Sequence, residues 1–338
     1  MEVNHRKITP AKDEPGTDDR KVVCKSFTDV EDFKAFFEYQ NKEIIQLSPG
    51  SLQAEFLSIQ VGHLYFVCNQ TNQGFHFSGE GRKEYISFAI IWSENKKEYY
   101  SFRHPVDPER TLFGFNNREA DEIFPHGGTL THILMPVKTF DAYANQLQRH
   151  DLDDTFRRRN HVHLLPTGMK EIKAYLKQLV WLAVHKPTWL QNPHLEELVA
   201  DDFLPLLISQ IPLKWNSKSF FKPSRRSKLI TRAEQKMLAS LEKPLTLKQL
   251  AEDLESSSSA LSYGFQDFFG LSPMRYLKVR RLNAVRERLK TSEPENCTIA
   301  TLASRFGFYN PSHFTKDYKA MFGELPSETL QNTARCKS

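Results

Sequence analysis

Hydrophobic and polar residues alternate along the segment from about 51 to 137, as expected of short β-strands. The alternating sets are Leu57/Ile59/Val61, Leu64/Phe66/Cys68 and Ile86/Phe88/Ile90/Trp92. Stretches rich in Asn and Gly separate these runs at 69–72, 78–81 and 126–128. Many short strands joined by turns predict an antiparallel barrel or sandwich. We expect an α+β protein whose N-terminal part is a cupin-like β-barrel with helices and whose C-terminal part is all-α.

The period of the hydrophobic pattern becomes helical after residue 138. Apolar positions three and four apart mark three amphipathic segments, at 140–147, 172–183 and 195–199. We expect a loose tail at 1–20, a barrel domain at 21–150 and a helical support or dimerisation segment at 151–212. The polar, basic stretch at 213–227, with Pro223 and several serines, is typical of a linker.

Aromatic residues are concentrated in the strand-rich segment. Small barrels can enclose one small ligand, and aromatic side chains suit the wall of such a pocket. The candidates for lining an effector pocket are Phe66, Phe77, Tyr85, Phe88 and Trp92. The alternative for each ring is a place in the apolar core, where aromatic residues are common.

One supersecondary unit occurs twice after residue 228. Leu250 and Ala251 recur 52 residues later, and four further positions recur after 53 residues: Leu261/Phe314, Phe265/Tyr318, Gly270/Gly323 and Pro273/Pro326. Each unit has the pattern of helix, tight turn and helix. A helix-turn-helix places its second helix in the major groove of DNA. We therefore expect helix-turn-helix motifs at about 246–267 and 299–321 within a domain at 228–330.

Local signals define the ends of these helices. Thr246 and Gln249 form a capping box, and Asn310 followed by Pro311 is typical of a helix start. Gly307 occupies the turn of the second unit, where a positive φ favours glycine. Glu255 occupies the same turn in the first unit, which predicts a strain of about 1 kcal/mol or more if its φ is positive.

Charge is unevenly distributed along the chain. The net charge of +5 is the sum of about −5 over residues 1–212 and about +10 over residues 213–338. An acidic front and a basic back indicate that the back binds a polyanion, the alternative being a solvated basic surface. The helix between the two motifs is basic, and the residues expected to contact phosphates are Arg275, Lys278, Arg280, Arg281 and Lys319. Two rigidly joined readers would enter successive major grooves about 34 Å apart.

Residues 228–330 resemble the paired helix-turn-helix domain of AraC/XylS-type transcription regulators. The matching positions are Leu250-Ala251, Leu261, Phe265, Gly270, Ser272-Pro273, Tyr276-Leu277, Arg281-Leu282, Leu302-Ala303, Gly307-Phe308, Ser312-His313-Phe314, Lys316, Phe322-Gly323 and Pro326. The front half, at Thr28-Asp-Val-Glu31 and Gln46-Leu-Ser-Pro49, is similar to regulators akin to the ethanolamine-utilisation regulator.

The resemblance implies which residues read bases. In the first unit these are Ser259, Ala260, Ser262 and Tyr263, and in the second they are Pro311, Ser312, Thr315 and Lys316. It also implies binding to double-stranded promoter DNA, contact with RNA polymerase in activation, an unknown small-molecule effector and a homodimer. The chain departs from the family pattern in three places. Glu255 occupies a turn position where glycine is usual, and Arg288 occupies a leucine position of the connecting helix. The first reading helix lacks the usual arginine or glutamine at the positions of Ser259 and Tyr263.

Other chemistry has weaker support in the sequence. His161 and His163, followed by Glu171, resemble the start of a cupin metal motif, but the expected upstream glycine and close glutamate are missing. No P-loop or G-x-S-x-G motif is present. We expect no catalytic residue, metal or cofactor. The alternatives are a cupin-like metalloenzyme fused to a DNA-binding domain and a barrel that serves only as a dimer scaffold.

The sequence also indicates a compartment. The four cysteines, Cys24, Cys68, Cys297 and Cys336, form no C-x-x-C pair, and a reducing environment fits such scattered thiols. No apolar run approaches the roughly 20 residues that a membrane helix needs. The first residues lack the apolar segment of a secretory signal. We expect a cytoplasmic protein without a membrane partner.

Overall fold

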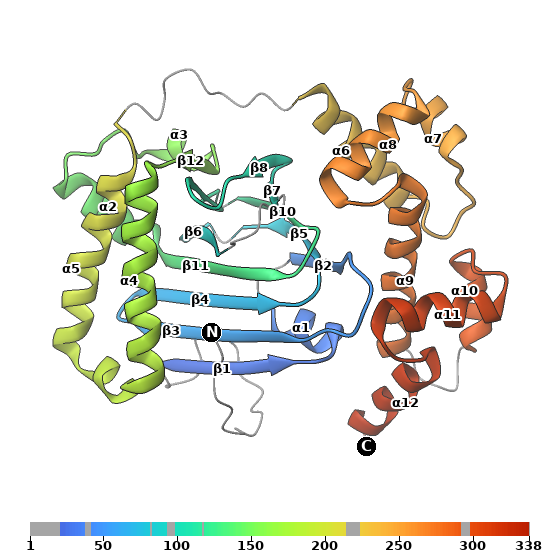
Figure 1. Ribbon diagram of the computed structural model, residues 1–338, viewed down its shortest axis with the longest axis horizontal. Coiled ribbons are helices and arrows are strands. Elements are labelled where there is room, and N and C mark those ends of the chain that lie inside the picture. Colours follow the sequence, from blue (N-terminus) through green and yellow to red (C-terminus); the bar gives the residue numbers. More distant parts are fainter. Residues whose placement is uncertain are drawn as a thin grey trace.

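The computed structural model describes most of the chain, and its elements confirm an α+β protein with a strand-rich front and a helical back (Figure 1). The described residues are 21–37, 42–81, 83–92, 99–116, 118–213, 224–291 and 298–337, with side chains to 331. The expected tail at 1–20 and most of the expected linker at 213–227 lie outside these ranges. No helix among the described residues has the length and apolar character needed to cross a membrane.

The strands form two antiparallel sheets. The seven-stranded sheet has the order β1 (Val22–Phe27), β3 (Ala54–Val61), β4 (Leu64–Thr71), β11 (Gly128–Pro136), β6 (Tyr85–Trp92), β9 (Thr111–Phe113) and β12 (His161–His163). The five-stranded sheet has the order β2 (Lys42–Gln46), β5 (Phe75–Glu80), β10 (Glu119–Phe124), β7 (Tyr99–Ser101) and β8 (His104–Val106). Neither sheet closes on itself among the described strands, so the expected closed barrel is not confirmed.

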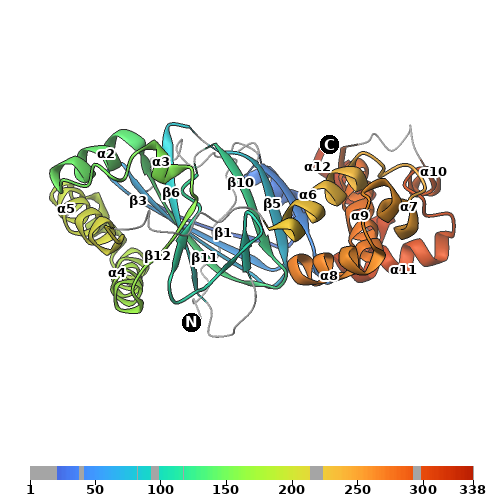
Figure 2. The same cartoon turned by 90° about the horizontal axis from the view of Figure 1, so that it is seen from above.

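Helices cover the outer face of the seven-stranded sheet (Figure 2). They are α2 (Val137–Gln146), α3 (Asp154–Arg157), α4 (Pro166–His185), the 3-10 helix η2 (Pro187–Gln191) and α5 (Pro193–Gln210). Their apolar stripes and the even-numbered residues of β4 and β6 form one buried cluster, which includes Phe66, Phe88, Phe140 and Phe203. The three predicted amphipathic segments are confirmed as α2, α4 and α5.

A short helix, α1 (Val30–Phe36), covers one end of the space between the sheets. Its N-cap is Asp29, whose carboxylate accepts hydrogen bonds from the backbone N–H groups of Glu31 and Asp32. Phe33 on α1 is buried against Phe75 on β5.

The C-terminal part is entirely helical. It consists of α6 (Arg225–Leu238), α7 (Leu247–Asp253), α8 (Ser258–Phe269), α9 (Pro273–Thr291), α10 (Ile299–Arg305), α11 (Pro311–Phe322) and α12 (Pro326–Lys337). The pairs α7–α8 and α10–α11 are the two predicted bihelical units, joined by α9 (Figure 1). Each unit has its own buried cluster, which contains the residues that repeat along the sequence.

Candidate nucleic-acid interface and inner cavity

The first bihelical unit is built from the residues that its sequence pattern marks. Thr246 and Gln249 make the predicted capping box at the start of α7, with both reciprocal hydrogen bonds present. Leu250 and Ala251 on α7 pack with Leu261 on α8, and all three are buried. Since Ala251 is small, the two helices can approach closely at the turn.

The second unit repeats this construction. The Asn310 side chain accepts a hydrogen bond from the backbone N–H of His313 at the start of α11. Leu302 and Ala303 on α10 pack with Phe314 and Tyr318 on α11 in the second cluster. The repeat inferred from spacing is therefore a repeat of buried side chains.

The turns differ between the two units. Gly307 has a φ of +83°, and Glu255 has a φ of +51°, which confirms that a glutamate adopts the left-handed conformation in the first turn. A side chain at position 307 would bring its Cβ to 3.1 Å from an Nη atom of Arg281. Glycine thus allows the second turn both its positive φ and the close approach of Arg281. The first turn has a glutamate at this position and bears the strain of a non-glycine residue with positive φ.

The residues expected to read bases lie on the outer faces of α8 and α11. Ser259, Tyr263, Pro311, Ser312 and Lys316 are exposed, and Ala260, Ser262 and Thr315 are half-buried. Both helices lie along the same edge of the C-terminal part, the lower edge in Figure 2. Two second helices that share one edge are suited to approach one face of a duplex.

The expected phosphate contacts divide into two groups. Arg275 and Lys319 are exposed, and Lys278 forms an ion pair with Asp317 at 2.6 Å on the surface. Arg281 instead donates hydrogen bonds to the backbone carbonyls of Leu241 and Lys243, at 2.9 and 2.6 Å.

For Arg280 the expectation is wrong in this arrangement. Its residue is only 3% exposed, and its guanidinium lies 2.7 Å from the Glu43 carboxylate of β2. Burial alone would lower the pKa of Arg280, but Tyr276 and Glu43 outweigh burial and raise it. The side chain therefore joins the two halves of the molecule and does not face solvent.

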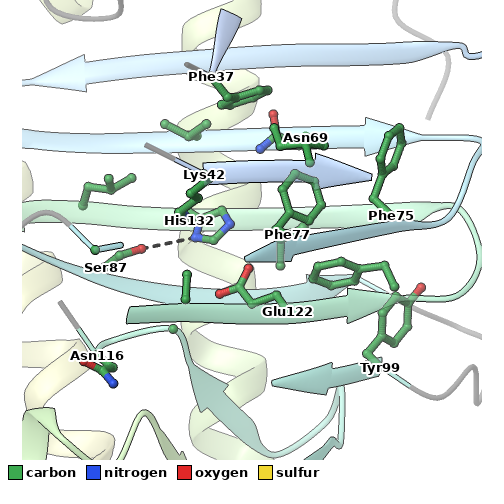
Figure 3. Close-up of a pocket in the computed structure, with 18 of the residues that line it drawn as sticks. Phe37, Lys42, Asn69, Phe75, Phe77, Ser87, Tyr99, Asn116, Glu122 and His132 are labelled. Carbon is green, nitrogen blue, oxygen red and sulfur yellow. Dashed lines mark hydrogen bonds between the residues drawn. The ribbon is translucent and has the colours of Figure 1, made fainter. Parts of the chain in front are cut away.

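A cavity of about 120 Å³ lies between the two sheets (Figure 3). Of the five pocket candidates, Phe77 and Tyr85 line it. Phe66 and Phe88 instead belong to the cluster beneath α2 and α5, and Trp92 packs against that cluster. Their strands have apolar residues on both faces, and these three side chains point to the face that the helices cover.

Polar groups interrupt the mostly apolar cavity wall. Glu122 of β10 is 5% exposed, and burial raises the pKa of its carboxyl, with a smaller opposing effect of Lys42. His132 of β11 hydrogen-bonds to Ser87 of β6 at 3.2 Å. Burial, assisted by the charge of Lys42, lowers the pKa of His132 to about 3, so this imidazole is neutral at physiological pH. None of these residues was predicted from the sequence.

The outer face of the five-stranded sheet is covered by the helix-turn-helix domain. A charge cluster lies at this contact, formed by three buried residues, His76 of β5, Arg103 and Glu234 of α6, and by half-buried Asp121 of β10. His76 is 2.9 Å from Asp121 and 3.3 Å from Glu234, and Glu234 also pairs with Arg103 and accepts a hydrogen bond from Tyr276.

The members of this cluster shift one another's ionisation. Burial alone would lower the pKa of His76, but the carboxylates of Glu234 and Asp121 outweigh burial and raise it. Burial alone would raise the pKa values of Glu234 and Asp121, but His76 and Arg103 lower both. Each member of the cluster therefore favours the ionised form of its partners, and the attraction between them holds α6 against the sheet.

Helix α9 makes a second set of contacts with the front half. The Asn283 side chain exchanges two hydrogen bonds with the Gln46 backbone, at 3.1 and 3.3 Å. Arg286 pairs with Asp29 at 2.7 Å, next to the start of α1. Helix α9 therefore touches β2 and the cap of α1, and these two elements line the cavity through Lys42 and Ile44 of β2 and Phe33 of α1.

Strand β10 presents alternate residues to the cavity and to the helix-turn-helix domain. Glu122 and Phe124 line the cavity, whereas Asp121 pairs with His76 and Arg103 of the charge cluster and Ile123 packs with the helices. The same alternation places Phe75 and Phe77 of β5 inside and His76 outside. A single layer of backbone thus separates the cavity from the helix-turn-helix domain.

The metal candidates do not converge. Among the residues that the structure describes, no group of three His, Cys, Asp or Glu side chains is placed to hold a metal ion. The His161 ring lies 5.2 Å from the His104 ring, and Glu171 accepts a hydrogen bond from Gln210. Nothing in this geometry favours a metalloenzyme.

Sequence reasoning missed the charge cluster and the polar cavity residues. The only signal in the sequence is the pair of adjacent carboxylates in Asp121-Glu122-Ile123-Phe124, within a short run that ends in two apolar residues. Because neighbouring side chains of a strand point to opposite faces, two adjacent acids in a buried strand must serve two different environments.

Comparison with known proteins agrees with this geometry. A family model described as a helix-turn-helix domain matches residues 250–332. The "Probable thc operon regulatory protein" of Rhodococcus erythropolis is 37% identical over 28% of this chain and 28% of its own length. The "XylDLEGF operon transcriptional activator 1" of Pseudomonas putida is 28% identical over 41% of this chain and 40% of its own length. The chain thus spans less than half the length of these two relatives.

A solved structure is also similar over the C-terminal part. It is described as a probable AraC family transcriptional regulator from Rhodopseudomonas palustris CGA009, with 33% identity and a TM-score of 0.29. The match covers 31% of this chain and 97% of that chain.

Proposed function

We propose, from the premise that this chain is an AraC/XylS-type regulator, that it is a cytoplasmic activator of transcription that binds promoter DNA through both helix-turn-helix units. The observation that carries the proposal is the pair of exposed second helices, α8 and α11, on one edge of the domain. The name of the Pseudomonas relative, an operon transcriptional activator, supports activation. RNA polymerase is then the expected protein partner.

The contacts to DNA follow from exposure. Lys316, Arg275 and Lys319 are exposed cations with no ion pair among the described residues, and they are placed to meet phosphates. Ser312 and Thr315 present hydroxyl groups that can donate to or accept from base edges in the major groove. Binding energy should come largely from phosphate contacts, so affinity should fall steeply as salt rises.

The cavity is the proposed effector site. Its wall residues on β2, β5 and β10 alternate with the residues that hold the helix-turn-helix domain. An effector that fits the cavity better in one arrangement of the two halves shifts the population toward that arrangement. The two facing sheets here take the place of the cupin-like barrel expected from the sequence.

The helices on the far side of the seven-stranded sheet are the proposed dimer surface. Trp181 and Val184 of α4, Trp189 of η2 and Leu198 of α5 are exposed large apolar side chains. Exposed apolar patches of this kind mark protein–protein contacts. A second copy of the chain would cover them and place two more helix-turn-helix units on the DNA.

Selection of duplexes from a random pool by the full chain, followed by salt titration, tests the proposed function. We expect one enriched sequence and a steep fall of affinity with salt. Ser312→Ala and Thr315→Val should change the enriched bases. The control Lys170→Ala, at an exposed residue of α4, should leave the enriched sequence and the affinity unchanged. The proposed function is rejected if the chain binds no duplex. The assignment of α11 as a base-reading helix is rejected if both variants select the same bases as the parent.

A further inference from the structure

The cavity contains a buried carboxyl group without a partner. Glu122 makes neither a hydrogen bond nor an ion pair with any described residue, although it is only 5% exposed. Its carboxyl lies over Gly114, where an added Cβ would come within 3.3 Å of a Glu122 oxygen. Buried polar groups in native proteins are ordinarily hydrogen-bonded, so an unpaired carboxyl aimed into a cavity points to a ligand.

The other polar atoms of the cavity favour the same kind of ligand. The side-chain oxygen of Asn69 is buried without a hydrogen-bond partner and is an acceptor, as are the oxygens of ionised Glu122. His132 is neutral and already bonded to Ser87. The interior therefore offers unmatched acceptors, and a ligand that brings donors and positive charge would satisfy them.

Aromatic rings surround these acceptors. Figure 3 shows Glu122 and His132 pointing into a space bounded by Phe37, Phe75 and Phe77. The faces of aromatic rings attract cations, most strongly where water is excluded. The rings also provide an apolar surface for a hydrocarbon group.

We propose that the effector is a small organic ammonium ion, with its charged head against Glu122 and its hydrocarbon part among the rings. This inference rests on the proposed function, since it names the chemical class that the effector site accepts. Glu122 lies between Asp121, which pairs with His76 and Arg103 of the charge cluster, and Ile123, which packs with the helix-turn-helix domain. The ammonium head would thus act on the strand that holds the DNA-binding half.

Lys42 is the feature that favours the opposite class, a carboxylate. It lines the cavity from β2 and is half-buried, and it forms no ion pair with Glu122. Glu122 is the more buried of the two, and an anion beside it would meet like charge or require it to stay protonated. The two classes predict opposite pH dependence, which the experiment below uses.

Three probes of one shape distinguish the classes: 2-phenylethylamine, 2-phenylethanol and phenylacetate, each titrated into the full chain with thermal unfolding as the readout. We expect the amine alone to raise the Tm appreciably, since ligand bound to the folded state stabilises it. Glu122→Gln should lower the affinity for the amine about tenfold or more, as loss of one charged hydrogen bond does. The matched control is Glu55→Gln on β3, an exposed carboxylate that does not line the cavity, and it should bind as the parent does.

The affinity for the amine should rise with pH as Glu122 ionises, and this rise should vanish in Glu122→Gln. The other ionisable side chains that line this space are Lys42 of β2, Glu80 of β5, Tyr85 of β6, Tyr99 of β7, Glu119 of β10 and His132 of β11, and Asp121 lies on the opposite face of β10. Lys42→Gln separates the effect of the one cation among them.

Three results would overturn the inference: stabilisation by phenylacetate or 2-phenylethanol equal to that by the amine, unchanged affinity for the amine in Glu122→Gln, or no binding of the amine. Duplex binding by Glu122→Gln without any probe shows that the variant is folded. If the chain binds DNA and the carboxylate is the ligand, the proposed function stands and only the ligand class is wrong. If no duplex is bound, the proposed function fails whatever the cavity holds.

Discussion

The two helix-turn-helix units have the same buried framework but differ in their turns, their outer faces and their contacts. Leu261 and Phe265 of the first unit correspond to Phe314 and Tyr318 of the second, and all four are buried. The outer face of α8 carries Ser259 and exposed Tyr263, whereas the equivalent positions of α11, 53 residues later, carry Ser312 and Lys316. Packing has thus kept the core constant while the exposed faces diverged.

Two units with the same fold need not contribute equally to the energy of DNA binding. The second unit has a cation on its reading face, and the first has none. The first unit packs on α6, whose Glu234 belongs to the charge cluster shared with the front half, and Asp267 of α8 pairs with Arg226 of α6. The second unit meets the front half only through polar backbone contacts among the hydrogen bonds described, in which the Met321 carbonyl of α11 accepts from the Gln46 side chain and the Gly50 N–H. We infer that the second unit contributes more to DNA contact and the first more to docking.

The largest expected effect on stability comes from shortening a buried side chain in the apolar core that the two units have in common. Phe314→Ala should destabilise the second unit by about 3–5 kcal/mol, and Leu261→Ala should cost the first about 2–5 kcal/mol, because each leaves a cavity in a closed cluster. Thermal unfolding followed by circular dichroism measures both. A cost below about 1 kcal/mol for either would show that its cluster is not the core of that unit.

The packing of the first unit and α6 against the front half should depend on the charge cluster almost as strongly as each unit depends on its apolar core. Glu234→Gln leaves Arg103 and His76 with an uncompensated buried charge, which typically costs about 3 kcal/mol or more. Amide hydrogen exchange of α6 and α8 is the measurement. The control is Lys236→Gln on the same helix, whose ion pair with Asp253 is exposed and should contribute little.

The same cluster predicts a pH window. The folded pKa of His76 lies above its ordinary value of 6.5, so its stabilisation is complete below that pH and is lost as pH rises through the folded value. The folded pKa values of Asp121 and Glu234 lie below their ordinary values of 3.8 and 4.5. The stabilisation that these carboxylates provide is therefore present above the ordinary values and is lost as the pH falls through the lowered pKa values. Protection of α6 should be greatest between these limits, and His76→Gln should remove the alkaline limb. A limb that persists in this variant would assign it to another group.

The sequence predicts well what short-range pattern controls. The capping box at Thr246 and the cap at Asn310 depend on residues within a few positions, and both are confirmed. For Glu255 the sequence left the sign of φ open, and the structure shows that it is positive. The duplicated core could be read from spacing because buried positions tolerate few residue types.

The sequence does not predict which distant surfaces meet. Glu234 and His76 are far apart in the chain, and each resembles an ordinary solvated residue until the two halves are packed together. Arg280 was expected at phosphate because its helix is basic, but basic composition does not say which side of a helix is covered. Strand β6 has apolar residues on both faces, so its pattern leaves open which of them face the cavity.

The next effect concerns the reading faces. Lys316→Ala should weaken duplex binding by about 1 kcal/mol, or about fivefold, across sequences, and should lower the salt slope by about 1. Tyr263→Ala, at the equivalent position of α8, should leave the salt slope unchanged because no cation is removed. Band-shift titrations at several salt concentrations give both values. Equal loss of salt slope in the two variants would show that the units contribute alike to phosphate contact.

The smallest effect concerns the turns, where the two units should respond in opposite directions to similar changes. Glu255→Gly relieves a left-handed glutamate but gives the unfolded chain more freedom, so a net gain of at most about 1 kcal/mol is expected. Gly307→Ala should cost about 1–2 kcal/mol, because its φ of +83° suits only glycine well and its Cβ would press on the Arg281 guanidinium. Paired Tm measurements on the full chain test the signs. If Glu255→Gly destabilises the protein, the glutamate side chain must itself stabilise the turn, and the first unit would then have replaced glycine with a different means of holding the same conformation.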